Sequence, residues 1–199
     1  MKLEKTLFEA KRKLLHTIAG LFFMMAIYFD MITGFQIFLI LVLGVVLSFL
    51  VRRYRIPLIS KLVESFERKE YIKTFPGKGA IFLVFGILLT YELFEKNLAL
   101  ASIWIITFGD AITSLVRTYY LEIKRLKKKI WFPSIFGFLV SWAGASLFIG
   151  PFFGFVASLG GMVAEYLDWE VNKNSVDDNF IIPLAAATSV IIVRKIFNL

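Results

Sequence analysis

The chain has 199 residues, of which 58% are hydrophobic, and its mean hydropathy is +0.75. A soluble domain of this length carries less apolar material, and the strands of a membrane barrel would alternate polar and apolar residues, so both classes are excluded. Because the chain has no cysteine, disulfides and cysteine-based metal sites are excluded as well. The composition predicts an all-α polytopic membrane protein with a single domain over 1–199.

Seven apolar segments follow one another along the chain. Several have only about 16 residues, which make roughly 25 Å of helix and cross a bilayer core only without much tilt. The longest apolar stretch contains Gly150-Pro151, so we expect a helical hairpin there instead of one long helix. We predict spans at about 14–29, 35–51, 79–94, 98–117, 130–149, 151–167 and 180–196.

The loop after the second predicted span has the pattern of an interfacial helix. Pro57 can open a helix, and Lys61 and Arg68 fall on the polar side of it. The apolar residues that recur at helical spacing are Ile59, Leu62, Val63 and Phe66. We therefore predict a cytoplasmic amphipathic helix that lies on the membrane surface and contacts anionic lipid headgroups.

The net charge of +8 is explained by where the basic residues fall between the spans. All but three of the 23 Lys and Arg residues precede the first span or lie in the loops after the second, fourth and sixth, the exceptions being Lys96, Arg194 and Lys195. The positive-inside rule then predicts a cytoplasmic N-terminus, cytoplasmic loops at these three places and a C-terminus outside. We expect no nucleic-acid partner, since topology already accounts for the charge.

Asp110 stands inside the fourth predicted span, seven residues before Arg117. This spacing places it roughly 10 Å from the end of the span, where an ionisable group is costly and is a functional candidate by default. The alternative is a structural polar contact between helices, with a Lys or Arg that reaches inward. Gly109 leaves room beside Asp110 for another backbone or for a ligand.

Two further ionisable residues stand at span ends. Glu165 follows Gly160 and Gly161, which permit close helix packing, but a carboxylate at a span end can simply be hydrated. Lys13 and His16 share one face of the first helix in the stretch KRKLLH. Taken alone, each of these patterns is more often structural than catalytic.

The stretch SVDDNFIIPLA precedes the last predicted span. Asp177, Asp178 and Asn179 can each cap a helix, and acidic residues suit its positive end. Pro183 leaves two alternatives: the helix begins after Ile182 and the preceding residues are irregular, or it begins near Asp178 and Pro183 kinks it. Both differ from an ordinary span start, which favours a binding role for the acidic residues.

Two basic segments are expected on the same side of the membrane. The turn TFPGKGA contains Gly77, Lys78 and Gly79, and backbone amides in such turns can hold phosphate. The run Lys124–Lys129 either faces lipid headgroups or meets a nucleoside triphosphate. Carboxylates with basic neighbours together suit a Mg²⁺–nucleotide complex, because Mg²⁺ binds hard oxygen ligands and shares them with phosphates.

These segments resemble a known family. RKLLH, the entry GKGAIFLVFG, the GDA that ends at Ala111, and Glu165 followed by DDNFIIPL look like the CTP-dependent lipid-alcohol kinases, over most of the chain and in the same order. The family includes dolichol kinase, phytol kinase and yeast-type diacylglycerol kinase, and it is related to the phosphatidate cytidylyltransferases. The segment after GDA departs from the family pattern, which leaves the nucleotide preference open.

The resemblance implies transfer of the γ-phosphate of CTP to a polyprenol, dolichol or other lipid alcohol, with Mg²⁺ as cofactor. It implies catalytic roles for Asp110, Asp178 and Glu165, with Asp110 accepting the hydroxyl proton. It implies metal binding by Asp110, Asp177 and Asp178. The residues implied for nucleotide or phosphate binding are Lys13, His16, Gly77, Lys78, Gly79, Lys128, Lys129 and Asn179.

Two other functions remain open from the residues. One is a CTP-dependent cytidylyltransferase that acts on a phospholipid or a prenyl phosphate. The other is a non-enzymatic membrane transporter or scaffold whose buried acids bind ions or protons.

Overall fold

A computed structural model describes residues 2–54, 57–67, 69–72, 74–123, 131–167, 170–171 and 174–198. Over these residues the chain is helical except for turns and one pair of very short antiparallel strands, which confirms the predicted all-α class. The elements are α1 (Lys2–Tyr28), α2 (Gly34–Arg53), α3 (Pro57–Phe66), α4 (Lys69–Ile72), α5 (Lys78–Leu93), α6 (Lys96–Trp104), the π-helix η1 (Ile105–Gly109), α7 (Asp110–Thr118), the π-helix η2 (Tyr119–Ile123), α8 (Phe132–Tyr166), β1 (Glu170–Val171), β2 (Asn174–Ser175) and α9 (Asp178–Phe197).

Four helical segments in the described part of the chain are long and apolar enough to cross a membrane, as expected for an integral membrane protein. They are Gly34–Arg53, Lys96–Leu121, Phe132–Tyr166 and Asp178–Phe197. The predicted surface helix is present as α3, with Lys61 exposed and Val63 half-buried. Its apolar residues Ile59 and Leu62 have side chains outside the described set.

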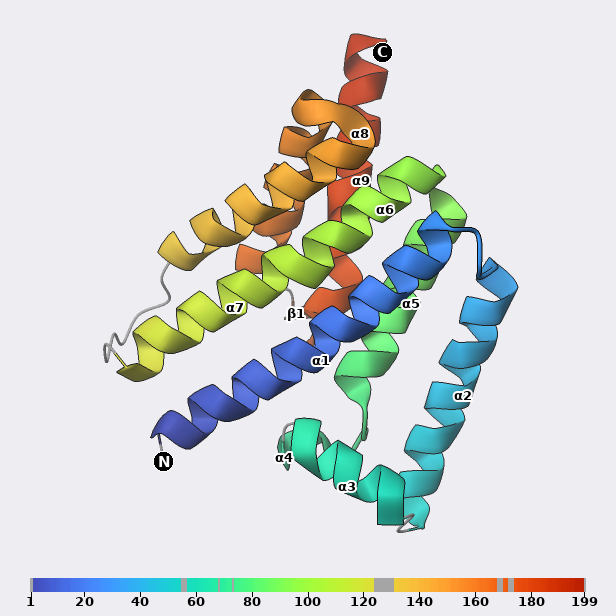
Figure 1. The fold of residues 1–199 in the computed structure, drawn as a ribbon, viewed down its shortest axis with the longest axis vertical. Coiled ribbons are helices and arrows are strands. Elements are labelled where there is room, and N and C mark those ends of the chain that lie inside the picture. Colours follow the sequence, from blue (N-terminus) through green and yellow to red (C-terminus); the bar gives the residue numbers. More distant parts are fainter. Residues whose placement is uncertain are drawn as a thin grey trace.

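One rod lies at the centre of the bundle. α6, η1, α7 and η2 follow one another without a break and form this rod, which packs against α1, α5, α8 and α9 (Figure 1). Most of its first half is enclosed, since every residue from Leu98 to Ile103 is buried. The predicted fourth span is therefore the element around which the other helices assemble.

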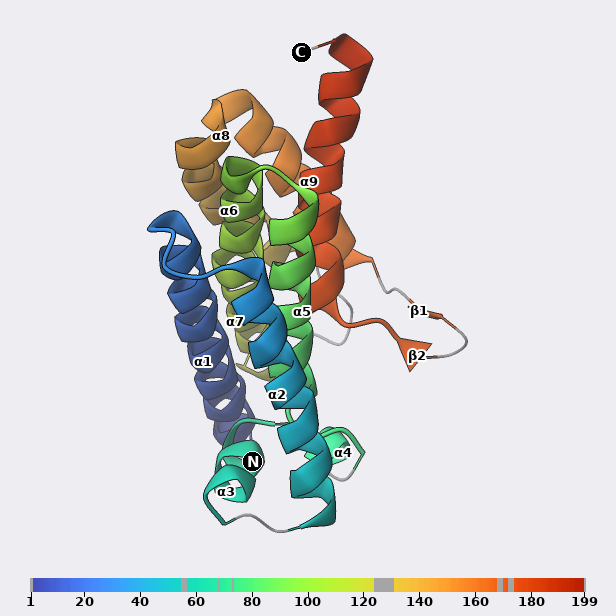
Figure 2. The ribbon, with the colours of Figure 1, turned by 90° about the vertical axis from the view of Figure 1, so that its right-hand side faces the viewer.

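The predicted break at Gly150-Pro151 is confirmed. Gly150 has a φ of 78° and a ψ of 163°, a conformation that favours glycine, and it divides α8 into two arms. The indole Nε1 of Trp142 donates to the Pro151 carbonyl at 2.9 Å, and Gly154 in the second arm lies against Ser146 in the first. The two arms therefore return on each other as a helical hairpin (Figure 2).

The last helix begins at Asp178, which decides between the two alternatives for Pro183. Asp177 is the N-cap, and its carboxylate accepts the Asn179 amide at 3.2 Å. The helix continues through Pro183, so of the two alternatives the start near Asp178 is correct and the irregular segment up to Ile182 is excluded. Because proline has no N–H, it cannot bond to the Asn179 carbonyl, which instead lies directly against Gly86 of α5.

Candidate functional site

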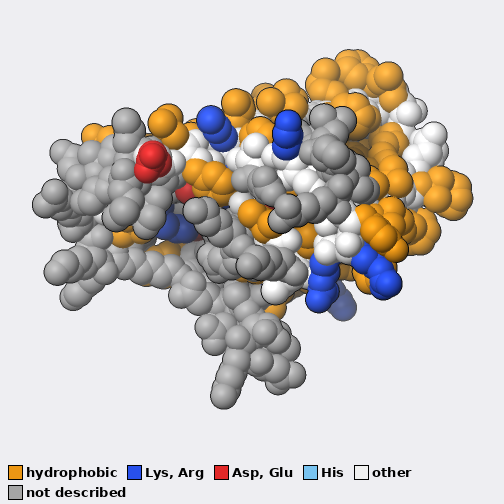
Figure 3. All heavy atoms as spheres, turned by 90° about the horizontal axis from the view of Figure 1, so that it is seen from below, with side chains coloured by type: hydrophobic (Ala, Val, Ile, Leu, Met, Phe, Trp, Pro, Cys, Tyr) orange, Lys and Arg blue, Asp and Glu red, His pale blue; other side chains and the backbone are white. Residues whose placement is uncertain are grey.

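Polar side chains converge on a cavity of about 100 Å³ near one end of the bundle. We call it the polar cavity. It lies between α1, α5, α7 and the start of α9, close to α4, and the end of the molecule seen from below carries several Lys and Arg side chains (Figure 3). The charged residues that line it on these four segments are Arg12, Lys13, Lys78, Asp110, Asp177 and Asp178.

Asp110 and Lys13 form a buried ion pair that joins α1 to α7. The two residues are 4% and 5% exposed, and the Lys13 ammonium donates to Oδ2 of Asp110. The Nε2 atom of His16 lies 3.8 Å from the same oxygen. The inward-reaching basic residue that the sequence left open as an alternative is therefore Lys13, which is itself one of the predicted site residues.

The π-helix η1 explains why α1 docks at this point. In η1 the Asp110 amide donates to the Ile105 carbonyl five residues back, so the usual α-helical pairing is shifted. His16 donates from Nε2 to the Ile106 carbonyl at 3.2 Å, and the Thr17 hydroxyl donates to the Thr107 carbonyl at 3.4 Å. Polar groups of α1 thus satisfy carbonyls of the π-helix immediately before Asp110.

Gly109 serves helix packing. A Cβ at Gly109 would collide with Ser141 and come within 3.4 Å of the Gly137 carbonyl, both in α8. Of the two neighbours that the sequence allowed for Gly109, another backbone or a ligand, the structure places the backbone of α8 there.

Glu165 belongs to a second buried group, which joins α7 to α8. Its Oε1 atom is 2.7 Å from the Arg117 guanidinium, and its Oε2 atom accepts the Ser134 hydroxyl at 3.2 Å. Glu165 is 5% exposed, which excludes the alternative of a hydrated carboxylate at a span end. Arg117, which the sequence assigned to a cytoplasmic loop, is its partner.

The two adjacent carboxylates at the start of α9 differ in environment. Burial raises the pKa of the Asp177 carboxyl above its ordinary value, while the Asn179 amide and Lys78, 4.0 Å away, act in the opposite direction. Asp178 is exposed, and it lies near enough to Asp110, Asp177 and Glu165 to feel their negative charges. A cation bound here would stabilise the charged forms of these carboxylates.

The glycine-rich turn stands beside the acidic residues. Gly77 has a φ of 76° and caps α5 without a side-chain hydrogen bond, and Lys78 and Gly79 line the polar cavity. The Asn179 side chain donates to the Gly79 carbonyl at 3.0 Å, so it holds the starts of α5 and α9 together. The backbone amide of Lys78, the first residue of α5, donates to the Phe75 carbonyl at 3.2 Å.

The carboxylates fit a Mg²⁺ ion that is shared with a phosphate chain. Within the described residues, no three His, Cys, Asp or Glu side chains lie close enough together to hold a metal ion. Mg²⁺ is usually held by one or two carboxylates together with phosphates and water, and Asp177 and Asp178 supply such a pair. Asp110, predicted as a third ligand, is ion-paired with Lys13.

The structure thus brings most of the predicted site residues to one place. Lys13, His16, Asp110 and the residues from Asp177 to Asn179 surround or adjoin the polar cavity, while Lys128 and Lys129 lie outside the described residues. Sequence reasoning did not assign a role to four residues. Arg12, Glu67 and Tyr71 line the cavity, and Arg117 pairs with Glu165. Of these four residues, only Arg12 could have been recognised from the sequence, because it stands beside Lys13 on α1.

Two proteins that are similar to this chain carry the name uncharacterized protein. The chain matches no family model, and no solved structure matches it. It is 28% identical to the uncharacterized protein MJ1137 of Methanocaldococcus jannaschii over 148 residues, which cover 74% of this chain and 73% of that protein. It is also 28% identical to the uncharacterized protein RP860 of Rickettsia prowazekii over 202 aligned positions, which cover 95% and 96%. These similarities span most of both proteins and assign no function.

Proposed function

We propose that this protein is a membrane phosphotransferase that moves the γ-phosphate of CTP, or of another nucleoside triphosphate, to the hydroxyl of a polyprenol, dolichol or other lipid alcohol. The observation that carries the proposal is the polar cavity, where three basic and four acidic side chains meet at one end of an apolar bundle. Basic groups suit a triphosphate, carboxylates suit Mg²⁺ and a proton acceptor, and apolar helices admit a lipid from the side.

In the proposed reaction, the lipid hydroxyl oxygen forms a bond to the γ-phosphorus, the bond to the bridging oxygen breaks, and the nucleoside diphosphate leaves. Asp110 accepts the hydroxyl proton, and Lys13 holds its carboxylate in place. Lys78 and the glycine-rich turn around it bind the phosphate chain. Asp177 and Asp178 would hold Mg²⁺, which offsets phosphate charge when bound.

We also propose that the polar cavity faces the cytoplasm, that α1, α5 and the two arms of α8 complete seven spans, and that α3 rests on anionic lipid headgroups. The support is the gathering of Lys and Arg at the cavity end of the molecule, together with the positive-inside rule (Figure 3). The chain has no cysteine, so single cysteines report orientation directly. Lys61→Cys should resist a membrane-impermeant maleimide in intact cells, and Lys96→Cys should react; the reverse pattern would invert the orientation.

The decisive experiment is an assay of purified protein in vesicles with several lipid alcohols and with CTP labelled at either the γ- or the α-phosphate. We expect label in the extracted lipid from γ-labelled CTP only, and its loss in Asp178→Asn. Asp30→Asn is the matched control, because Asp30 is an exposed carboxylate paired with Lys96 outside the cavity. Parallel reactions with ATP, GTP and UTP measure the nucleotide preference.

The two alternatives give different results in the same assay. A cytidylyltransferase would label the lipid from α-labelled CTP and release pyrophosphate. A transporter or scaffold would leave the lipid unlabelled with every nucleotide, and either result would overturn the kinase proposal.

A further inference from the structure

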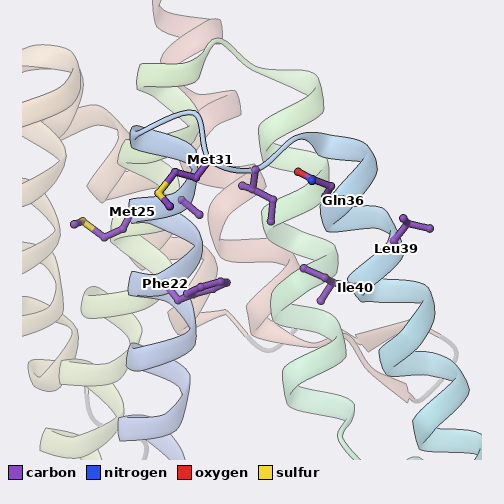
Figure 4. Close-up of a pocket in the computed structure, with 8 residues that line it drawn as sticks. Phe22, Met25, Met31, Gln36, Leu39 and Ile40 are labelled. Carbon is purple, nitrogen blue, oxygen red and sulfur yellow. The ribbon is translucent and has the colours of Figure 1, made fainter.

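A second cavity, of about 620 Å³, lies between α1 and α2, and we call it the α1–α2 groove. Its lining is uncharged. Phe22 of α1 and Ile40 of α2 point toward each other across it, and Met31 lies near the connection between the two helices (Figure 4). The one polar side chain in the lining is Gln36, whose Oε1 atom already accepts the Thr33 amide at 2.8 Å in the cap of α2.

The groove opens toward the surroundings of the bundle. α2 packs mainly against α5, so the side of α1 that faces α2 keeps large apolar residues uncovered. Phe22 is 60% exposed and Leu39 is 48% exposed. Because α2 is one of the helices able to cross a membrane, an occupant of this groove would come from the hydrocarbon phase.

One face of α1 connects the groove with the polar cavity. Arg12, Leu15, Phe22 and Ala26 are separated by three, seven and four residues, so they lie along the same side of the helix. Arg12 lines the polar cavity, Leu15 is 45% exposed, and the other two line the groove. The distance along α1 from Arg12 to Ala26 is roughly 21 Å, the length of a long hydrocarbon chain.

We propose that the α1–α2 groove holds the hydrocarbon chain of the lipid substrate, whose polar end lies beside Arg12 at the polar cavity. The inference rests on the proposed function for the chemistry of that polar end. The groove itself is argued from its uncharged lining, its opening toward lipid and its continuity with a charged cavity. A single-chain amphiphile matches this arrangement, because it has one polar end and one apolar tail.

The test is photolabelling with a long-chain alcohol that carries a diazirine at the far end of its chain, without nucleotide, on the full chain in vesicles. We expect the label in the peptides that contain Phe22 to Ile40. Ala26→Phe and Leu39→Trp should each lower this labelling about tenfold, because extra side-chain atoms then occupy the space of the chain. Leu147→Phe is the control, since Leu147 is an exposed residue of α8 outside the groove.

A second probe of the same chain without the hydroxyl separates a substrate site from ordinary contact with bilayer lipid. Equal labelling by both probes, or equal labelling of α8 and the groove, would overturn the proposal. Two groove variants, Ala26→Phe and Leu39→Trp, are used so that misfolding of one does not decide the result. The labelling of each variant is compared only if its thermal unfolding midpoint matches that of the unaltered protein. Labelling of the groove without any phosphate transfer would support the groove as a site for the lipid chain and would overturn the proposed kinase activity. Phosphate transfer together with photolabelling of other peptides would overturn only the proposal that the groove holds the lipid chain.

Discussion

The central rod is less hydrophobic than α2, and yet much more of it is buried. Within their apolar windows, 67% of the rod's residues are buried, against 17% of those in α2. The rod packs against four neighbouring helices, whereas α2 packs mainly against α5. In lipid, hydrophobicity marks the helices that face the hydrocarbon, and small or polar residues mark the helices that face other helices.

The rod and α2 also differ in the type of side chain that they contribute to the two cavities. The rod carries Asp110 and Arg117, and each pairs with a charged residue of another helix. α2 contributes uncharged side chains to the α1–α2 groove. Substitutions in the rod are therefore expected to change stability, and those in α2 to change contacts with lipid.

The largest effect is expected for Asp110→Asn, which leaves the buried Lys13 ammonium without a charged partner. We expect a loss of about 3–5 kcal/mol in the free energy of unfolding, measured by denaturant titration in detergent. Asp110→Asn combined with Lys13→Met should recover most of it. Asp30→Asn breaks an exposed pair and should cost at most about 1 kcal/mol. Equal losses in Asp110→Asn and Asp30→Asn would contradict the contrast between buried and exposed pairs.

A pair of truncations compares the apolar side chains of the two regions directly. Ile103→Ala in the rod should lower the free energy of unfolding by about 2–5 kcal/mol, since Ile103 is fully buried and a cavity remains. Leu43→Ala in α2 should stay within about 0.5 kcal/mol of the unaltered protein, because Leu43 is 57% exposed. Unfolding monitored by tryptophan fluorescence measures both. Comparable losses would mean that α2 is packed against another element.

The smallest effect is expected for a pair of glycine substitutions. Gly109→Ala should cost about 1–3 kcal/mol, because the new methyl group collides with Ser141 of α8. Gly44→Ala in α2 should gain about 0.5–1 kcal/mol, because its methyl group meets Ile81 at an ordinary 3.6 Å and alanine favours the helix. Thermal unfolding midpoints in the same detergent should fall for Gly109→Ala and rise for Gly44→Ala. A loss of stability in Gly44→Ala as large as that in Gly109→Ala would contradict the difference in packing between α2 and the rod.

Much of the fold could be predicted from local patterns. Apolar runs located the helices, Gly150-Pro151 located the hairpin, and Asp177 is the cap that its residue type predicted. These features depend on backbone chemistry and hydropathy within one turn or two. The candidate site was also recognised in part, since ionisable residues in apolar helices are costly enough to stand out.

The pairing of those residues could not be predicted. Arg117 reads as one more basic residue at a span end, and only its position in space reveals that it meets Glu165. Lys13 was expected to bind phosphate, and its ion pair with Asp110 depends on how α1 crosses the rod. The sequence left two starting points for the last helix, and the choice of Asp178 could not be predicted because it involves Gly86 of α5, which lies against the Asn179 carbonyl.

The π-helix η1 also sets the phase of the rod. One residue corresponds to about 100° of helix rotation, so the wider turn in η1 changes the direction in which every later side chain points relative to α6. Leu98–Ile103 of α6 can therefore be buried on every side while Asp110 still turns toward Lys13. Deletion of one residue within 105–109 would keep the composition and the hydropathy of the rod and rotate its charged half out of alignment with α1.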